Sequence, residues 1–110
     1  MISKNSINKV ILVGRAGKNP ETKYTPTGSC VSTFSIATNE QWLDLDGNKK
    51  EHTEWHSIVA WNKLAEFTKE YIKKGQLIYI EGRIHTQSWI DNNNVRQKKH
   101  EIICDTITPL

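Results

Sequence analysis

Apolar and polar residues alternate along much of this chain in a way that predicts five β-strands. We expect these strands to cover residues 7–13, 29–39, 53–61, 76–89 and 96–107. The first has consecutive apolar positions, which is typical of a strand covered on both faces at its centre. In the second, Phe34 and Ile36 face opposite to Thr33 and Ser35, as the period of two in a half-buried strand requires.

A helix is predicted after the third strand, over residues 62–74. Asn62 is a favourable residue for capping its N-terminus, and Gly75 is suited to the position just past its C-terminus. Two lysines in the last turn, at 73 and 74, would interact favourably with the helix dipole. The apolar residues that recur at helical spacing are Leu64, Phe67, Tyr71 and Ile72.

Polar segments separate the strands. Residues 15–28 form a polar loop after Gly14, residues 40–52 form a long connection with Asp46-Gly47 at its tip, and residues 91–94 form a polar turn. A helix between the third and fourth of five strands is the layout of an OB-fold barrel, whose sheet face and loops bind oligonucleotides. We therefore expect an all-β chain, a five-stranded Greek-key OB barrel with one helix and long β-hairpin loops, as a single domain over residues 1–110.

Composition narrows the class of protein. Mean hydropathy is −0.60, and the aliphatic run at residues 10–13 is far too short to span a bilayer or to act as a signal sequence. Cys30 and Cys104 are isolated, so we expect buried thiols in a reducing cytoplasm rather than a disulfide or a metal site. A formal net charge of +3 permits binding to a polyanion without requiring it.

Four tryptophans in a chain of 110 residues need an explanation. One interpretation is that they fill the barrel core, as large aromatic residues often do. Strand parity favours another, because Trp55 and Trp61 share the less aliphatic face of the third strand and lie roughly 20 Å apart along it. Trp89 shares a face with Arg83, and Trp42 lies in a polar hairpin. Exposed rings among basic residues are typical of proteins that bind single-stranded nucleic acid.

Basic residues occupy the loops and strand ends around these rings, where a nucleic-acid backbone would need neutralising. The pair Lys98-Lys99 has a second interpretation, which is protection of an edge strand against aggregation.

The histidines leave an enzymatic interpretation open. His52, Glu54 and His56 alternate on one face of a strand, where they are candidate ligands of a metal ion. Alternate strand residues are about 7 Å apart, however, so they converge on an ion only with help from other ligands. The sequence has no His-Glu-x-x-His motif and no Ser-His-Asp set. A structural or interface role is favoured, and we expect no enzymatic activity, no metal and no cofactor.

Six segments, taken in order, form a recognisable pattern. They are N-K-V-I-L-V-G at residues 8–14, N-P-E-T-K-Y-T-P-T-G at 19–28, T-E-W-H at 53–56, K-L-A-E at 63–66, K-G at 74–75 and Y-I-E-G-R-I at 79–84. This pattern closely resembles the bacterial-type single-stranded DNA-binding protein family over nearly the whole chain. The resemblance implies an OB fold and non-sequence-specific binding of single-stranded DNA in replication, recombination and repair. It also implies a homotetramer, with a dimer as the alternative, in the cytoplasm with the nucleoid or in an organelle.

The resemblance assigns roles to particular residues. The family's stacking aromatic residues correspond to Trp42, Trp55, Trp61 and Trp89. Trp61 departs from the phenylalanine often found there, which keeps the stacking function and enlarges the platform. The family's interface histidine corresponds to His56. The DNA-binding basic positions carried over are Lys9, Lys23, Lys63 and Lys74, and the local pattern adds Arg15, Lys49 and Arg83.

Members of this family commonly continue into a flexible linker and an acidic tail that recruits replication and repair proteins, whereas this sequence stops at Leu110. The sequence is then either a truncated core or a tail-less member of the organellar or accessory kind, and it does not support the recruitment of partners through such a tail. Three alternatives stay open: a dimeric accessory OB-fold protein, a metal-dependent nuclease built on the histidine cluster, and an RNA-binding protein.

Overall fold

The computed structural model describes residues 5–110, whose strands form one continuous sheet. The elements are β1 (Val10–Ala16), β2 (Glu21–Tyr24), β3 (Cys30–Leu43), β4 (Lys49–Trp61), α1 (Lys63–Tyr71), β5 (Leu77–Ile90) and β6 (Arg96–Pro109). The strands pair in the order β1-β5-β6-β4-β3-β2, and β1 also pairs with β3. This second pairing closes five strands into a barrel. The short strand β2 pairs only with β3 and is not one of the five barrel strands.

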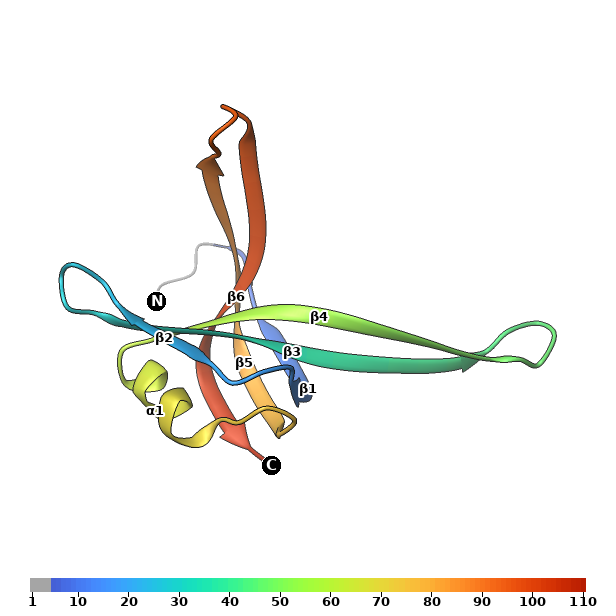
Figure 1. The fold of residues 1–110 in the computed structure, drawn as a ribbon. Coiled ribbons are helices and arrows are strands. Elements are labelled where there is room, and N and C mark those ends of the chain that lie inside the picture. Colours follow the sequence, from blue (N-terminus) through green and yellow to red (C-terminus); the bar gives the residue numbers. More distant parts are fainter. Residues whose placement is uncertain (1–4) are drawn as a thin grey trace.

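Two hairpin arms leave the barrel in different directions (Figure 1). The first arm is the outer part of β3 and β4, whose pairing continues to Leu43 opposite Lys49. The second arm is the outer part of β5 and β6, whose pairing continues to Ile90 opposite Arg96. Side chains on both faces of the outer strands are exposed, so the arms are held by backbone hydrogen bonds rather than by a core.

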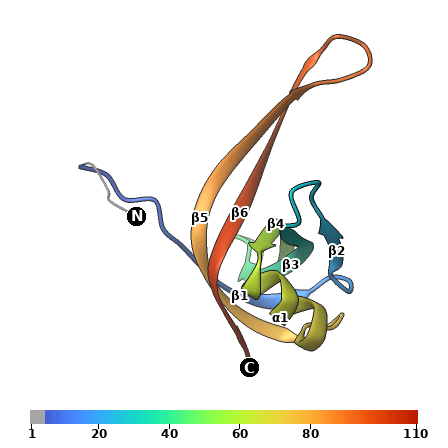
Figure 2. The same cartoon turned by 90° about the vertical axis from the view of Figure 1, so that its left-hand side faces the viewer.

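Isoleucines from several strands fill the barrel. Ile36, Ile58 and Ile80 are fully buried. The helix α1 lies at the foot of the barrel, at the end away from the second arm (Figure 2), and Ala65 and Ile72 join the same core. Over residues 5–110, α1 is the only helix, and its nine residues are too few to cross a membrane.

The predicted fold class is confirmed: the chain is an OB-fold barrel with one helix between its third and fourth barrel strands. The prediction for the first strand was wrong in two respects. Gly14 does not end this strand but lies buried within β1, where a Cβ atom would clash with the carbonyl oxygen of Ala37. The strand is also covered on one face only, because Ile11 and Val13 point outward from the barrel and are exposed.

The predicted loops at residues 15–28 and 40–52 were too long. The first contains the short strand β2, and most of the second belongs to the first arm. Residues 21–24 are mostly polar, and the apolar Trp42 and Leu43 are exposed on opposite faces of the arm, so no alternation of apolar and polar residues marks either segment as a strand. The backbone of β2 nevertheless pairs with β3, and the two sides of the first arm pair with one another, because backbone hydrogen bonds do not depend on side-chain polarity.

The prediction that the Asn62 side chain caps the helix was wrong. Asn62 precedes α1, but its side chain makes no capping hydrogen bond. Its backbone adopts a positive φ of 56°, which asparagine tolerates better than most residues. Its own N–H donates to the carbonyl oxygen of Cys30, at 2.8 Å, and its carbonyl accepts the N–H of Glu66, at 3.0 Å.

The helix also ends earlier than predicted, at Tyr71. Ile72 is extended and 1% exposed, because its side chain enters the core. The backbone N–H groups of Lys73 and Lys74 donate to the side-chain oxygens of Gln76 and Asn19, at 3.0 and 2.9 Å. These lysines therefore lie in the connection to β5 and not in the last turn of the helix.

Candidate functional site

The outward face of β3 and β4 holds two cross-strand rows that each join a basic residue to a tryptophan. Residues in register on neighbouring strands point to the same face, and adjacent strands lie about 4.8 Å apart. The basic residue and the tryptophan of each row are two strands apart, so their Cα atoms are separated by roughly 10 Å. We call this surface the aromatic face. Its rows are Lys23–Val31–Trp61 and Arg15–Ala37–Trp55.

A groove of about 330 Å³ lies between the two rows and extends to β6. The strand positions between the tryptophans supply short side chains to its floor: Thr33, Ser35, Ser57 and Val59. Its charged lining residues are Lys18, Glu21, Lys99 and Glu101. The groove therefore combines hydroxyl groups, two ammonium groups and two carboxylates beside exposed rings.

Trp55 is 60% exposed, but one edge of its ring lies on the backbone of the β1–β2 connection. A Cβ atom on Gly17 would lie 2.5 Å from Cζ3 of Trp55 and 2.7 Å from Oγ of Ser35. Only a glycine at position 17 lets the indole lie this close to the chain. The ring is thus seated on one side and open to solvent on the other.

All four tryptophans are partly exposed, and none lies in the core. Trp55 and Trp61 lie on the barrel, whereas Trp42 and Trp89 lie on separate arms. Trp89 shares its face of the second arm with Lys99, which lines the groove. Trp42 is directly opposite Lys50 and lies on the other face of the β3–β4 ribbon from Trp55. The structure therefore places two of the predicted rings on one face of the barrel and the other two on the arms.

The remaining predicted basic residues are spread more widely. Lys63 begins α1 two positions after Trp61, and Lys49 begins β4 at the tip of the first arm. Arg83 is half-buried on β5 opposite Ile103, on the same face as Trp89.

Two predicted basic residues are engaged by protein groups. The ammonium of Lys9 forms an ion pair with Glu81 at 3.2 Å, and this hydrogen bond raises the pKa of Lys9 above its ordinary value. The guanidinium of Arg15 donates to the carbonyl oxygen of Gly75 at 3.0 Å. The hydrogen bond places the Arg15 guanidinium beside the connection from α1 to β5.

The sequence pattern placed Lys18 and Lys99 only among the basic residues around the rings, with edge-strand protection as a second interpretation for Lys99, and it did not single out Glu21 or Glu101. Lys18 and Glu21 fall in a segment expected to be a loop. Lys99 and Glu101 could have been found from strand parity. They lie two and four positions after Gln97, which pairs with Trp89, so they share its face of β6.

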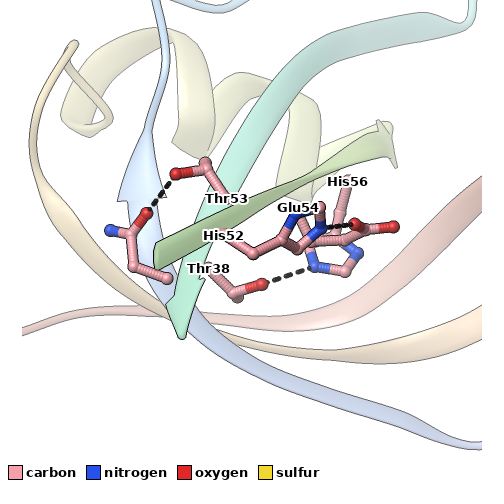
Figure 3. Close-up of polar contacts among 6 residues, drawn as sticks. Thr38, His52, Thr53, Glu54 and His56 are labelled. Carbon is pink, nitrogen blue, oxygen red and sulfur yellow. Dashed lines mark hydrogen bonds and ion pairs between the residues drawn. The ribbon is translucent and has the colours of Figure 1, made fainter. Parts of the chain in front are cut away.

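The histidine cluster does not form a metal site. Figure 3 shows that the His52 ring contacts the carboxylate of Glu54, with Nε2 and Oε2 2.8 Å apart. This contact lowers the pKa of Glu54. The ring of His56 instead contacts the hydroxyl of Thr38, with Nε2 and Oγ1 2.9 Å apart. Within residues 5–110, no three His, Cys, Asp or Glu side chains are close enough to hold a metal ion.

His56 lines a second hollow of about 390 Å³, between β4 and β6. Ile84, which is 52% exposed, and His100 lie on the same hollow.

Both cysteines are buried free thiols, as predicted. Burial raises the pKa of Cys104 to about 12.

Comparison with known proteins places this geometry in a family. The model of the single-strand binding protein family matches residues 7–110. A single-stranded DNA-binding protein of Neisseria meningitidis serogroup B is 43% identical over 105 residues, which cover 96% of this chain and 60% of that protein. Single-stranded DNA-binding protein 1 of Chlorobaculum tepidum is 49% identical over 100 residues, which cover 89% of this chain and 61% of that protein. The chain thus spans about 60% of the length of these relatives.

Solved structures agree with the fold. A structure of the Plasmodium falciparum SSB in complex with single-stranded DNA has a TM-score of 0.88 and 34% identity, and the match covers 99% of each chain. A deletion variant of the single-stranded DNA-binding protein from Thermus aquaticus has a TM-score of 0.82 and 27% identity, over 94% of this chain and 50% of that one. Given the family match over residues 7–110 and these levels of identity, the chain belongs to the single-strand binding protein family.

Proposed function

We propose that this chain binds single-stranded DNA without sequence specificity in replication, recombination and repair, and that it is not an enzyme. The observation that carries the proposal is the pair of rows on the aromatic face, each with a cation and an exposed indole ring. Any base can stack on an indole, and cations neutralise the backbone without reading sequence. The related Plasmodium falciparum protein was solved with single-stranded DNA.

In this proposal the bases stack on Trp42, Trp55, Trp61 and Trp89. The phosphates are contacted by Lys9, Arg15, Lys23, Lys49, Lys63, Lys74 and Arg83. Lys23 has the strongest support, because it is in register with Trp61 two strands away. Arg15 is likewise in register with Trp55, but its guanidinium already donates to the carbonyl oxygen of Gly75. Lys9 has less support, because Glu81 already engages its ammonium. Lys18 and Lys99 are added because they line the groove.

A matched pair of aromatic substitutions tests the stacking role. Trp55 on the aromatic face and Tyr71 on α1 are both 60% exposed, so their removal alters the surface to a similar degree. Trp55→Ala should weaken binding to oligo-dT by roughly 1–3 kcal/mol, the usual value of one stacked base. Tyr71→Ala should leave the affinity unchanged. Equal affinities for both variants and the wild type, at matched salt, would contradict the stacking role of Trp55.

Salt dependence tests the role of the basic residues. The logarithm of the binding constant should fall linearly with the logarithm of the salt concentration, with a slope near −0.7 for each phosphate neutralised. Lys23→Gln should make this slope shallower by about that amount, through the loss of one contact. A slope near zero for the wild type would exclude backbone neutralisation. Parallel titration with oligo-U would show whether the site prefers DNA to RNA.

We also propose that the chain assembles with itself as a homotetramer, with His56 at an interface between subunits. Three apolar residues on outward surfaces support association, because Ile11, Val13 and Ile84 are about half exposed. Ile84 lies beside His56 on the second hollow. Native mass spectrometry should give the mass of four chains, and His56→Ala should shift the population toward smaller species. A dimer in the wild type would favour the accessory OB-fold alternative.

A further inference from the structure

The two arms end in nine-residue segments that have similar residues at equivalent positions. Residues 42–50 read W-L-D-L-D-G-N-K-K, and residues 89–97 read W-I-D-N-N-N-V-R-Q. Each begins with a tryptophan, an aliphatic residue and an aspartate, and each has a basic residue at its eighth position. We call these two segments the first tip and the second tip.

At the first tip, one carboxylate oxygen organises the turn. Oδ1 of Asp44 accepts the backbone N–H groups of Asp46, at 3.0 Å, and Asn48, at 2.8 Å. The N–H of Asp44 donates to the carbonyl of Asn48 at 2.9 Å, and the N–H of Gly47 donates to the carbonyl of Asp44 at 3.0 Å. Gly47 has a positive φ of 78°. Oδ2 of Asp44 lies 4.0 Å from Nζ of Lys50.

The second tip repeats each of these contacts at the equivalent position. Oδ1 of Asp91 accepts the N–H groups of Asn93 and Val95, both at 2.9 Å. The N–H of Asp91 donates to the carbonyl of Val95 at 3.0 Å, and the N–H of Asn94 donates to the carbonyl of Asp91 at 3.1 Å. Asn94 has a positive φ of 61°. Oδ2 of Asp91 accepts the side-chain amide of Gln97 at 2.9 Å.

The tips present the same groups to solvent. Trp42 and Trp89 are 48% and 43% exposed, each on one face of its arm. On the opposite faces, Leu43 lies across from Lys49 and Ile90 lies across from Arg96. Each tip therefore offers a ring to a base on one face, and a cation to a phosphate on the other.

The aspartates oppose this use by their charge, because a carboxylate repels a DNA backbone. Without them, however, two backbone N–H groups at each tip would lose the acceptor that orders the turn, and DNA would have to order it on binding. Such ordering reduces affinity. We propose that Asp44 and Asp91 are positioning residues that hold two equivalent nucleotide-binding tips in their binding shape before DNA arrives. This inference rests on the proposed function.

Four variants separate positioning from charge. Asp44→Ala and Asp91→Ala remove both the charge and the acceptor, whereas Asp44→Asn and Asp91→Asn remove the charge but keep a side-chain oxygen that can accept the same N–H groups. Affinity is measured for a long dT oligonucleotide that reaches the arms. A short dT oligonucleotide that spans only the roughly 20 Å between Trp55 and Trp61 serves as the control for an intact barrel.

Positioning predicts opposite outcomes for the two substitutions. Each alanine variant should bind the long oligonucleotide roughly two- to tenfold more weakly than the wild type, the range expected for ordering a loop on binding. Each asparagine variant should bind it at least as tightly as the wild type. All four should bind the short oligonucleotide like the wild type, except for a slight tightening from the lost charge.

Three results would overturn the inference. They are alanine variants that bind the long oligonucleotide as tightly as the asparagine variants, an effect at one tip only, and alanine variants that lose binding to both oligonucleotides equally. Failure of the proposed function looks different, because the wild type itself would then bind neither oligonucleotide.

Discussion

The seat of Trp55 makes Gly17 a sensitive position, although its side chain is only a hydrogen atom. In Gly17→Ala the new methyl group would lie 2.5 Å from Cζ3 of the ring, whereas non-bonded carbon atoms prefer about 3.5–4.0 Å. The ring must therefore move outward by roughly 1 Å or change its rotamer. Because Trp55 is mostly exposed, this movement should cost little folding stability. It should displace the platform on which a base is proposed to stack.

The expected loss of affinity has an upper bound. Complete removal of a stacking ring costs roughly 1–3 kcal/mol per base, and a displaced ring should lose part of that. We expect Gly17→Ala to weaken oligo-dT binding by about 1 kcal/mol, or roughly fivefold. The assay is a titration at fixed salt of four proteins: the wild type, Gly17→Ala, Trp55→Ala and the double variant. Circular dichroism and thermal melting serve as the control for folding.

The double variant isolates the cause, because a double-mutant cycle measures the coupling between two residues. If Gly17 acts only through the ring, then Gly17→Ala should have no further effect once Trp55 is alanine. Equal losses in the two backgrounds would refute this reasoning and would assign the effect to the backbone or to Ser35. Wild-type affinity in Gly17→Ala would show that the seat has no role in binding.

Three further predictions concern stability and reactivity. Gly82→Ala should destabilise the fold by about 1–3 kcal/mol in urea unfolding, because its Cβ would lie 2.9 Å from Cα of Cys104 in a packed strand pair; unchanged stability would show that β6 can move aside. With a pKa of about 12, the Cys104 thiol should react with a thiol reagent at about pH 8 only after unfolding, and fast labelling of native protein would contradict its burial. The Val95 N–H, the Gln97 amide and the Asn93 N–H lower the pKa of Asp91, so its stabilising contribution should be full above about pH 5 and should disappear as the pH falls through the lowered value. The stability difference between wild type and Asp91→Ala should therefore shrink in acid, and a constant difference would contradict this assignment.

The barrel could be predicted from sequence because its residues have a clear pattern. Phe34 and Ile36 are buried and alternate with polar or small residues, which is the period of two expected of a strand with one buried face. The helix was recognisable for the same reason. Its end at Tyr71 was not, since Ile72 is apolar and fits a helical pattern as well as the extended, buried position that it adopts.

The arms and the groove were harder to predict because no core marks them. Around Trp42 and Lys50 the side chains on both faces are exposed, so polarity does not distinguish a paired strand from a loop. The row that joins Lys23 to Trp61 depends on the register of three strands, and β2 itself was missed. The contact between Gly17 and Trp55 joins residues 38 positions apart, which no local pattern reports.

The way in which the barrel closes has a consequence for how the chain folds. The β4–β6 seam consists of two parallel pairs, Ile58 with Ile102 and Val59 with Ile103, and β1 meets β3 at only two pairs. Each arm, in contrast, is a hairpin whose two strands can pair progressively, starting from the turn that joins them. Contacts between distant parts of a chain carry a larger loop-closure entropy and form more slowly than local ones. The hairpins should therefore form early, and the rate of folding should be set by the closing of these short seams.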